Sequence, residues 1–176
     1  MGRFVPYWLV LLPLAACHVD VSCNGLTRYV DGEAVEGIVR KVAEQIGTID
    51  AVECPQIRAE VGATDRCTVA FELGDRPYGF VVKVEPPASG TADRFTVTAT
   101  MEVRLVGPGI QTLLDDGVHE QLGAGATITC PGLDRVRPAP ASGFVTCTVR
   151  AADGTETARR LDFTDKDTIA TLIAAP

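Results

Sequence analysis

Two stretches of the chain place apolar residues three or four positions apart, which is the spacing of one face of an α-helix. The first covers residues 35–46, with Asp31 before it as a capping residue and Gly47 after it as a stop. The second covers residues 110–122 and is followed by Gly123. Each stretch predicts an amphipathic helix with one buried face.

Elsewhere, apolar and polar residues alternate, as they do in a β-strand with one buried side. The longest alternation covers residues 95–105, and shorter ones cover 67–73 and 80–84. The last third of the chain alternates more weakly, at residues 145–149 and in the segments around 161–173. We expect antiparallel sheets, each with one buried and one solvated face.

Part of the sequence recurs 76 residues later in the chain. Cys54-Pro55 recurs as Cys130-Pro131, and the later Cys67-Thr68-Val69 recurs as Cys147-Thr148-Val149 after an insertion in the second copy. Self-similarity of this kind indicates duplication. The pattern predicts an α+β fold of two tandem repeats, each with one N-terminal helix packed on a small antiparallel β-meander.

The repeats are expected at residues 27–106 and 107–176, with Gly107-Pro108-Gly109 as the linker between them. The proline-rich segment 137–140 holds the insertion of the second copy, where a loop tolerates extra length.

Four cysteines occupy equivalent places in the two predicted repeats. The pairing that follows is Cys54 with Cys67 and Cys130 with Cys147, one internal disulfide for each repeat. Loops of this length stabilise a small domain by about 3 kcal/mol when a disulfide closes them. Crossed pairing between the repeats and a four-cysteine zinc site are the alternatives, and the zinc site lacks the C-x-x-C spacing such sites use.

The N-terminus predicts export. Residues 1–16 contain one basic residue, Arg3, and an apolar run too short to span a bilayer, as in a signal peptide. The run ends in Leu14-Ala15-Ala16-Cys17, which resembles the bacterial lipobox and implies lipidation of Cys17. A plain secretory signal cut elsewhere is the alternative.

The lipobox resemblance places the protein in the cell envelope. His18, rather than Asp, follows Cys17, so we expect the outer membrane if the host has two membranes. Residues 17–26 are interpreted as a tether. Cys23 lies within this tether and has no partner in the predicted pairing. We expect it to be a free thiol, to form an intermolecular disulfide, or to pair with Cys17 if Cys17 is not lipidated.

The order of helix, Cys-Pro, glycine and Cys-Thr-Val resembles domain-of-unknown-function family four-three-three-three, found in small secreted proteins and lipoproteins. The matching residues are Cys54, Pro55, Gly62, Cys67 and Thr68, and then Cys130, Pro131, Gly143, Cys147 and Thr148. The resemblance implies paired cysteines and an exported protein, and it implies no activity.

The net charge and the residue content restrict the classes of function that we expect. The formal net charge is −7, and loss of Arg3 with the leader makes it more negative, which argues against nucleic acid as a partner. We find no nucleophile beside a base in any catalytic motif, so the chain is expected not to be an enzyme.

Two acidic clusters are candidate metal ligands. They are Asp115, Asp116, His119 and Glu120 on the second helix, and Asp162, Asp165 and Asp167 near the C-terminus. Such acid pairs are common on solvated helix faces, and the second cluster lacks the glycine and glutamate of an EF-hand, so we expect neither metal nor cofactor.

These features together predict a lipid-anchored envelope lipoprotein that binds an envelope or extracellular protein, or has a structural role. The alternative is a protein inhibitor of a secreted or envelope hydrolase.

Overall fold

The computed structural model describes residues 8–9, 17–19, 21–24, 27–86, 95–163 and 171–174. The chain divides into two compact units. The N-terminal unit spans Leu14–Val103, and the C-terminal unit combines Arg104–Pro176 with Met1–Pro13.

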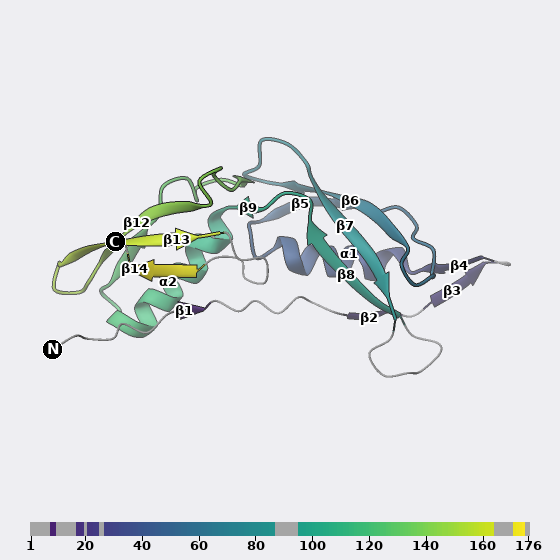
Figure 1. The fold of residues 1–176 in the computed structure, drawn as a ribbon, viewed down its shortest axis with the longest axis horizontal. Helices are drawn as coiled ribbons and strands as arrows, with labels where there is room; N and C mark the ends of the chain where they lie inside the picture. Colours follow the sequence, from purple (N-terminus) through teal and green to yellow (C-terminus); the bar gives the residue numbers. More distant parts are fainter. Residues whose placement is uncertain are drawn as a thin grey trace. The chain divides into compact units, whose positions relative to one another are not determined.

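The N-terminal unit contains a five-stranded antiparallel sheet with the strand order β2-β8-β7-β6-β5 (Figure 1). Its strands are β2 (Cys17–Val19), β5 (Ile49–Glu53), β6 (Thr64–Phe71), β7 (Tyr78–Glu85) and β8 (Phe95–Met101). A separate hairpin pairs β3 (Val21–Asn24) with β4 (Thr27–Val30). Alternate residues of β6 and β7 are buried, as the sequence pattern predicted.

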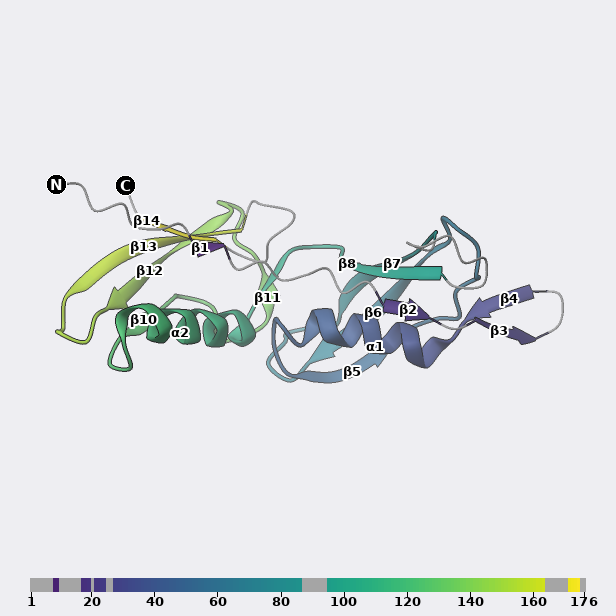
Figure 2. The ribbon, with the colours of Figure 1, turned by 90° about the horizontal axis from the view of Figure 1, so that it is seen from below.

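Helix α1 (Gly32–Ala43) covers the buried face of this sheet and contacts β5, β6, β7 and β8 (Figure 2). The Asp31 carboxylate caps it by accepting a hydrogen bond from the Glu33 backbone N–H, at 3.2 Å. The helix buries its apolar stripe against the sheet, in which Phe80 on β7 is completely buried. Burying one large apolar side chain stabilises the fold by about 1.5–3 kcal/mol, so this contact defines the core of the unit.

The C-terminal unit contains a second five-stranded antiparallel sheet, with the strand order β1-β14-β13-β12-β10 (its strands are labelled in Figure 2). Its strands are β1 (Trp8–Leu9), β10 (Thr127–Thr129), β12 (Phe144–Arg150), β13 (Glu156–Asp162) and β14 (Thr171–Ala174). A two-stranded ribbon joins β9 (Leu105–Val106) to β11 (Arg137–Pro138).

Helix α2 (Pro108–Leu122) begins without a side-chain cap, because its first turn is built from Pro108 after Gly107. Proline suits the first helical position, where its missing N–H costs nothing and its fixed φ already fits the helix. Gly123 ends the helix at a φ of 91°, a conformation that favours glycine. The predicted linker is therefore wrong at Pro108 and Gly109, which belong to α2.

The prediction of an α+β fold made of two tandem helix-plus-meander repeats is wrong. The part of the chain that the structure describes is mostly β, with 43% strand and 21% helix. Each five-stranded sheet also recruits a strand from the N-terminal segment, because β2 pairs with β8 and β1 pairs with β14. Neither sheet is thus a self-contained meander formed after its helix.

The long alternation over residues 95–105 does not form one strand. Strand β8 ends at Met101, and Leu105–Val106 pair instead with β11 in the other unit. Met101 pairs with Phe80 of β7, and the Glu102 backbone N–H still donates to the Gly79 carbonyl at 3.0 Å, one residue from the start of β7 at Tyr78. Alternation reports which side chains share a face, and it does not report where the partner strand stops.

Candidate binding surface

Two disulfides tie an edge strand of each sheet to its neighbour, which confirms both predicted pairings. Cys54 follows β5 and is bonded to Cys67 on β6, with a Cα–Cα distance of 4.3 Å. Cys130 follows β10 and is bonded to Cys147 on β12, also at 4.3 Å. Strands β5 and β10 stand at the ends of their sheets, so each has one strand neighbour among the described residues.

The solvated face of the N-terminal sheet carries threonines and paired charges. Thr98 and Thr100 on β8 lie at the register positions of Lys83 and Val81 on β7. Their hydroxyls donate to the backbone carbonyls of these two residues, at 3.5 Å and 3.4 Å. Lys83 also forms an ion pair of 3.1 Å with Glu85 along the same strand. The Thr98 and Thr100 hydroxyls and the charge of Lys83 are thus satisfied within the sheet, whereas the buried Thr96 hydroxyl on this face has no hydrogen-bond partner among the described residues.

An ion pair crosses the same face above Gly79. The Arg66 Nε atom lies 2.8 Å from a Glu102 carboxylate oxygen. A Cβ atom placed on Gly79 would lie 2.1 Å from Glu102 Oε2 and 2.6 Å from Arg66 Nε. The two side chains can meet across β7 because the residue between them has no side chain.

Tyr78 forms a polar site at the edge of the core of the N-terminal unit. Its hydroxyl donates to the Asp75 carboxylate at 2.5 Å, and its ring contacts Phe71 edge-on and lies under the Arg76 guanidinium. Burial, followed by the negative charge of Asp75, raises the pKa of Tyr78 above its usual value of 10.0. The tyrosine is 3% exposed, so it acts as a core residue whose hydroxyl is bonded to Asp75.

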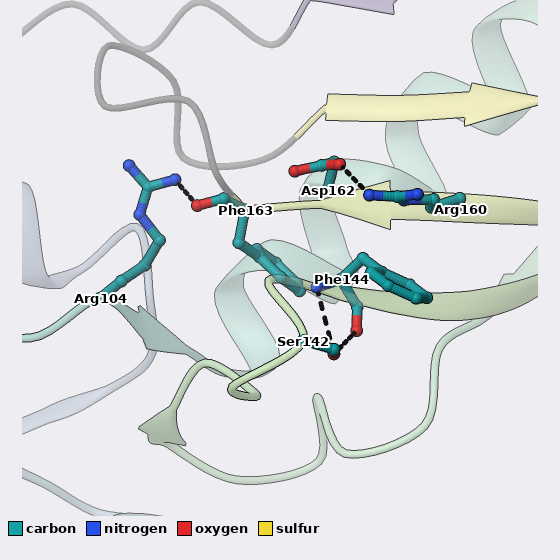
Figure 3. Close-up of polar contacts among 6 residues, drawn as sticks. All are labelled: Arg104, Ser142, Phe144, Arg160, Asp162 and Phe163. Atoms are coloured by element: carbon teal, nitrogen blue, oxygen red, sulfur yellow. Dashed lines mark hydrogen bonds and ion pairs between the residues drawn. The ribbon is translucent and has the colours of Figure 1, made fainter.

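The solvated face of the C-terminal sheet carries an aromatic–arginine pair, shown in Figure 3. The Arg160 guanidinium lies 4.0 Å from the centre of the Phe144 ring. It also donates to Asp162 at 2.8 Å, and Asp162 is the register partner of Phe144. Phe144, Arg160 and Asp162, which we call the Phe144 cluster, are each only partly exposed.

Two contacts hold the ends of the strands that carry this cluster. Ser142 caps the start of β12, because its hydroxyl donates to the Phe144 carbonyl at 2.8 Å (Figure 3). The Arg104 guanidinium donates to the carbonyl of Phe163, the residue after β13. Arg160 Nε is buried without a hydrogen-bond partner in the part of the chain that the structure describes. Two contacts therefore position the Arg160 guanidinium: its stacking on the Phe144 ring and its ion pair with Asp162.

The turn between β12 and β13 contains the other shifted group. Asp153 is fully exposed and accepts a hydrogen bond from the Thr155 backbone N–H at 2.9 Å. This hydrogen bond to the charged form lowers the pKa of Asp153. The arrangement is that of an Asx turn, in which the carboxylate serves the local backbone.

The acidic clusters do not form a metal site among residues 29–86 and 95–163. No group of three or more histidine, cysteine or acidic side chains there could hold an ion. Asp115 accepts hydrogen bonds from Gln111 at 3.2 Å, and Asp116, His119 and Glu120 are exposed along α2. Asp162 is paired with Arg160, while Asp165 and Asp167 lie outside the described residues.

The remaining predicted sites lie in the N-terminal segment. Cys17 is the first residue of β2, and Cys23 lies in β3 at the register position of Arg28. Of the predicted leader, residues 8–9 are described, as β1. Among the described residues, no helix has the length and apolar character needed to cross a membrane.

Sequence reasoning missed Gly79 and the Phe144 cluster. Both depend on register, because Phe144 meets Asp162 and Gly79 meets the ion pair only through cross-strand pairing. A glycine inside an otherwise apolar strand pattern was the available signal for Gly79, since such glycines mark close approaches.

No protein-family model matches the chain, and neither a curated protein nor a solved structure matches it. The resemblance to family four-three-three-three stays a prediction based on its motif residues.

Proposed function

We propose that this chain is a non-enzymatic, lipid-anchored module of the cell envelope that binds a protein partner. The observation that carries the proposal is the pair of disulfides, each fixing an edge strand of a sheet. Disulfides persist in oxidising compartments and are rare in the cytosol, which agrees with a lipobox-like segment ending at Cys17.

The Phe144 cluster is the best-suited contact surface for such a partner. Aromatic and arginine side chains are enriched in the binding hot spots of protein interfaces. Here both lie on a solvated sheet face, and the stacked ring and the Asp162 ion pair already restrain Arg160. A restrained side chain loses less entropy when a partner binds.

Fractionation tests the anchor. Cys17→Ala should move the protein from the membrane to the soluble envelope fraction, and Cys23→Ala is the matched control that should stay membrane-bound. Intact mass should show loss of residues 1–16 and addition of acyl chains to Cys17. Membrane retention of Cys17→Ala, or an unprocessed mass, would contradict the proposal.

Site-specific photo-crosslinking in intact cells tests the contact surface. A photoreactive residue at Thr146, beside the Phe144 cluster, should form a discrete protein adduct that Phe144→Ala abolishes. The same residue at Glu120, on the exposed side of α2, is the control and should give none. Absence of the Thr146 adduct would rule out this face, and a hydrolase in the adduct would favour the inhibitor alternative.

A further inference from the structure

We infer that the lipidated N-terminus is folded into the sheet of the N-terminal unit, so that the sheet edge β2–β8 is held against the membrane. The inference rests on the proposed function, because it takes Cys17 as the lipidated first residue; loss of residues 1–16 then removes β1 from the C-terminal sheet and leaves β2 in the N-terminal sheet. Residues 17–19 are then a docked strand rather than part of a free tether, and a lipid surface is the partner of the β2–β8 edge.

The strand pairing carries the inference. Cys17, His18 and Val19 pair in antiparallel register with Val97, Thr96 and Phe95 of β8. Strand β2 is the outermost strand on this side of the sheet, and it also contacts α1. The chain then continues through the β3–β4 hairpin, and the Val30 backbone N–H donates to the Ile57 carbonyl at 2.9 Å.

The burial of side chains on β8 agrees with its pairing to β2. Without β2, β8 would be the edge strand of this sheet, and edge strands expose backbone groups and side chains to solvent. Yet Val97 is 0% exposed and Thr96 is 7% exposed, although Thr96 lies on the same strand face as the more open Thr98 and Thr100. These exposures are those of the sheet with β2 in place, where β8 is an interior strand, so they agree with the pairing.

The consequence is a short distance between lipid and fold. A free flexible segment over residues 17–26 would separate its ends by about 17 Å on average. A paired strand instead keeps the Cys17 backbone about 4.8 Å from β8. The charges beside this edge on β7, Lys83 and Glu85, neutralise each other through their ion pair of 3.1 Å, so they do not oppose approach to a lipid surface.

Disulfide trapping tests the docking directly. The full-length chain, exported and lipidated in a Cys23→Ser background, would carry His18→Cys together with Thr96→Cys, its register partner. The matched control combines His18→Cys with Thr100→Cys, which lies about 13 Å further along the same face of β8. We expect at least a tenfold higher cross-linked fraction for the register pair, mapped by non-reducing peptide mass spectrometry.

A second measurement needs no new cysteine. Hydrogen exchange of the lipidated protein in vesicles should show slow exchange for the amides of residues 17–19, comparable with β3 and β4. Rapid exchange there, or equal trapping of the two cysteine pairs, would overturn the docked strand. If the mass shows no lipid on Cys17, the anchor fails, whereas trapping and exchange still report on the docking, so the two failures can be distinguished.

Discussion

Removing the Cys54–Cys67 bridge should destabilise the N-terminal unit at its edge. The bridge joins residues separated by 13 positions, and the loop-closure model assigns about 3 kcal/mol to a loop of this size. Cys67 is completely buried, so replacing both cysteines with alanine also removes a sulfur from the core. A loss of about 3–4 kcal/mol in the free energy of unfolding is expected.

The assay is urea unfolding without reductant, in a Cys23→Ser background that excludes thiol exchange. Hydrogen exchange supplies the spatial readout, because β5 should lose protection first, while β7 and β8 lie inside the sheet and keep theirs. The matched variant removes Cys130 and Cys147, separated by 17 positions, and its loop term should differ by only about 0.2 kcal/mol.

The reasoning is refuted if the Cys54–Cys67 variant loses less than about 1 kcal/mol, because the bridge would then contribute little beyond the packing around it. It is refuted equally if β5 and β7 lose protection to the same extent, since the bridge would then not act as a staple for the edge strand.

Two further predictions concern the N-terminal sheet. The pKa of Tyr78 is raised in the folded state, so the unfolded chain loses this proton first as the pH rises above 10. The free energy of unfolding should therefore fall as the pH becomes alkaline. Tyr78→Phe should weaken that fall in urea titrations from pH 8 to 11. A Cβ at Gly79 would displace the Arg66–Glu102 ion pair. A double-mutant cycle on Arg66 and Glu102 should give a coupling energy of about 0.2–1 kcal/mol for this exposed pair, and that energy should vanish in Gly79→Ala. Unchanged coupling in Gly79→Ala would contradict this geometry.

Periodicity was sufficient for the helices and for the faces of the strands. Apolar spacing located α1 and α2 to within a few residues, and Asp31 caps α1 as expected. Both disulfide pairings were also predicted from the sequence, because the equivalent positions of the four cysteines favoured one internal bridge for each repeat over crossed pairing. These features are local or symmetric, which is why a single sequence is enough to find them.

The predicted fold class was wrong because the alternation of apolar and polar residues does not specify which strands pair. Residues 8–9 and 17–19 were interpreted as leader and tether from their composition, yet each adds a strand to one of the two large sheets. The proline-rich segment at residues 137–140 was interpreted as an insertion loop, yet Arg137–Pro138 pair with Leu105–Val106. Long-range pairing of this kind depends on register and shape, which no local pattern specifies.

The position of the two bridges explains how a small surface stays well defined. Strand β10 has three residues, and β5 has a register irregularity between Ile49 and Ala51, so both edge strands depend on a weak ladder with one neighbour. A slip of one residue would turn every side chain to the opposite face. Each bridge follows directly after its edge strand and locks the register there. The bridges therefore fix which side chains the edge strands β5 and β10 present to solvent.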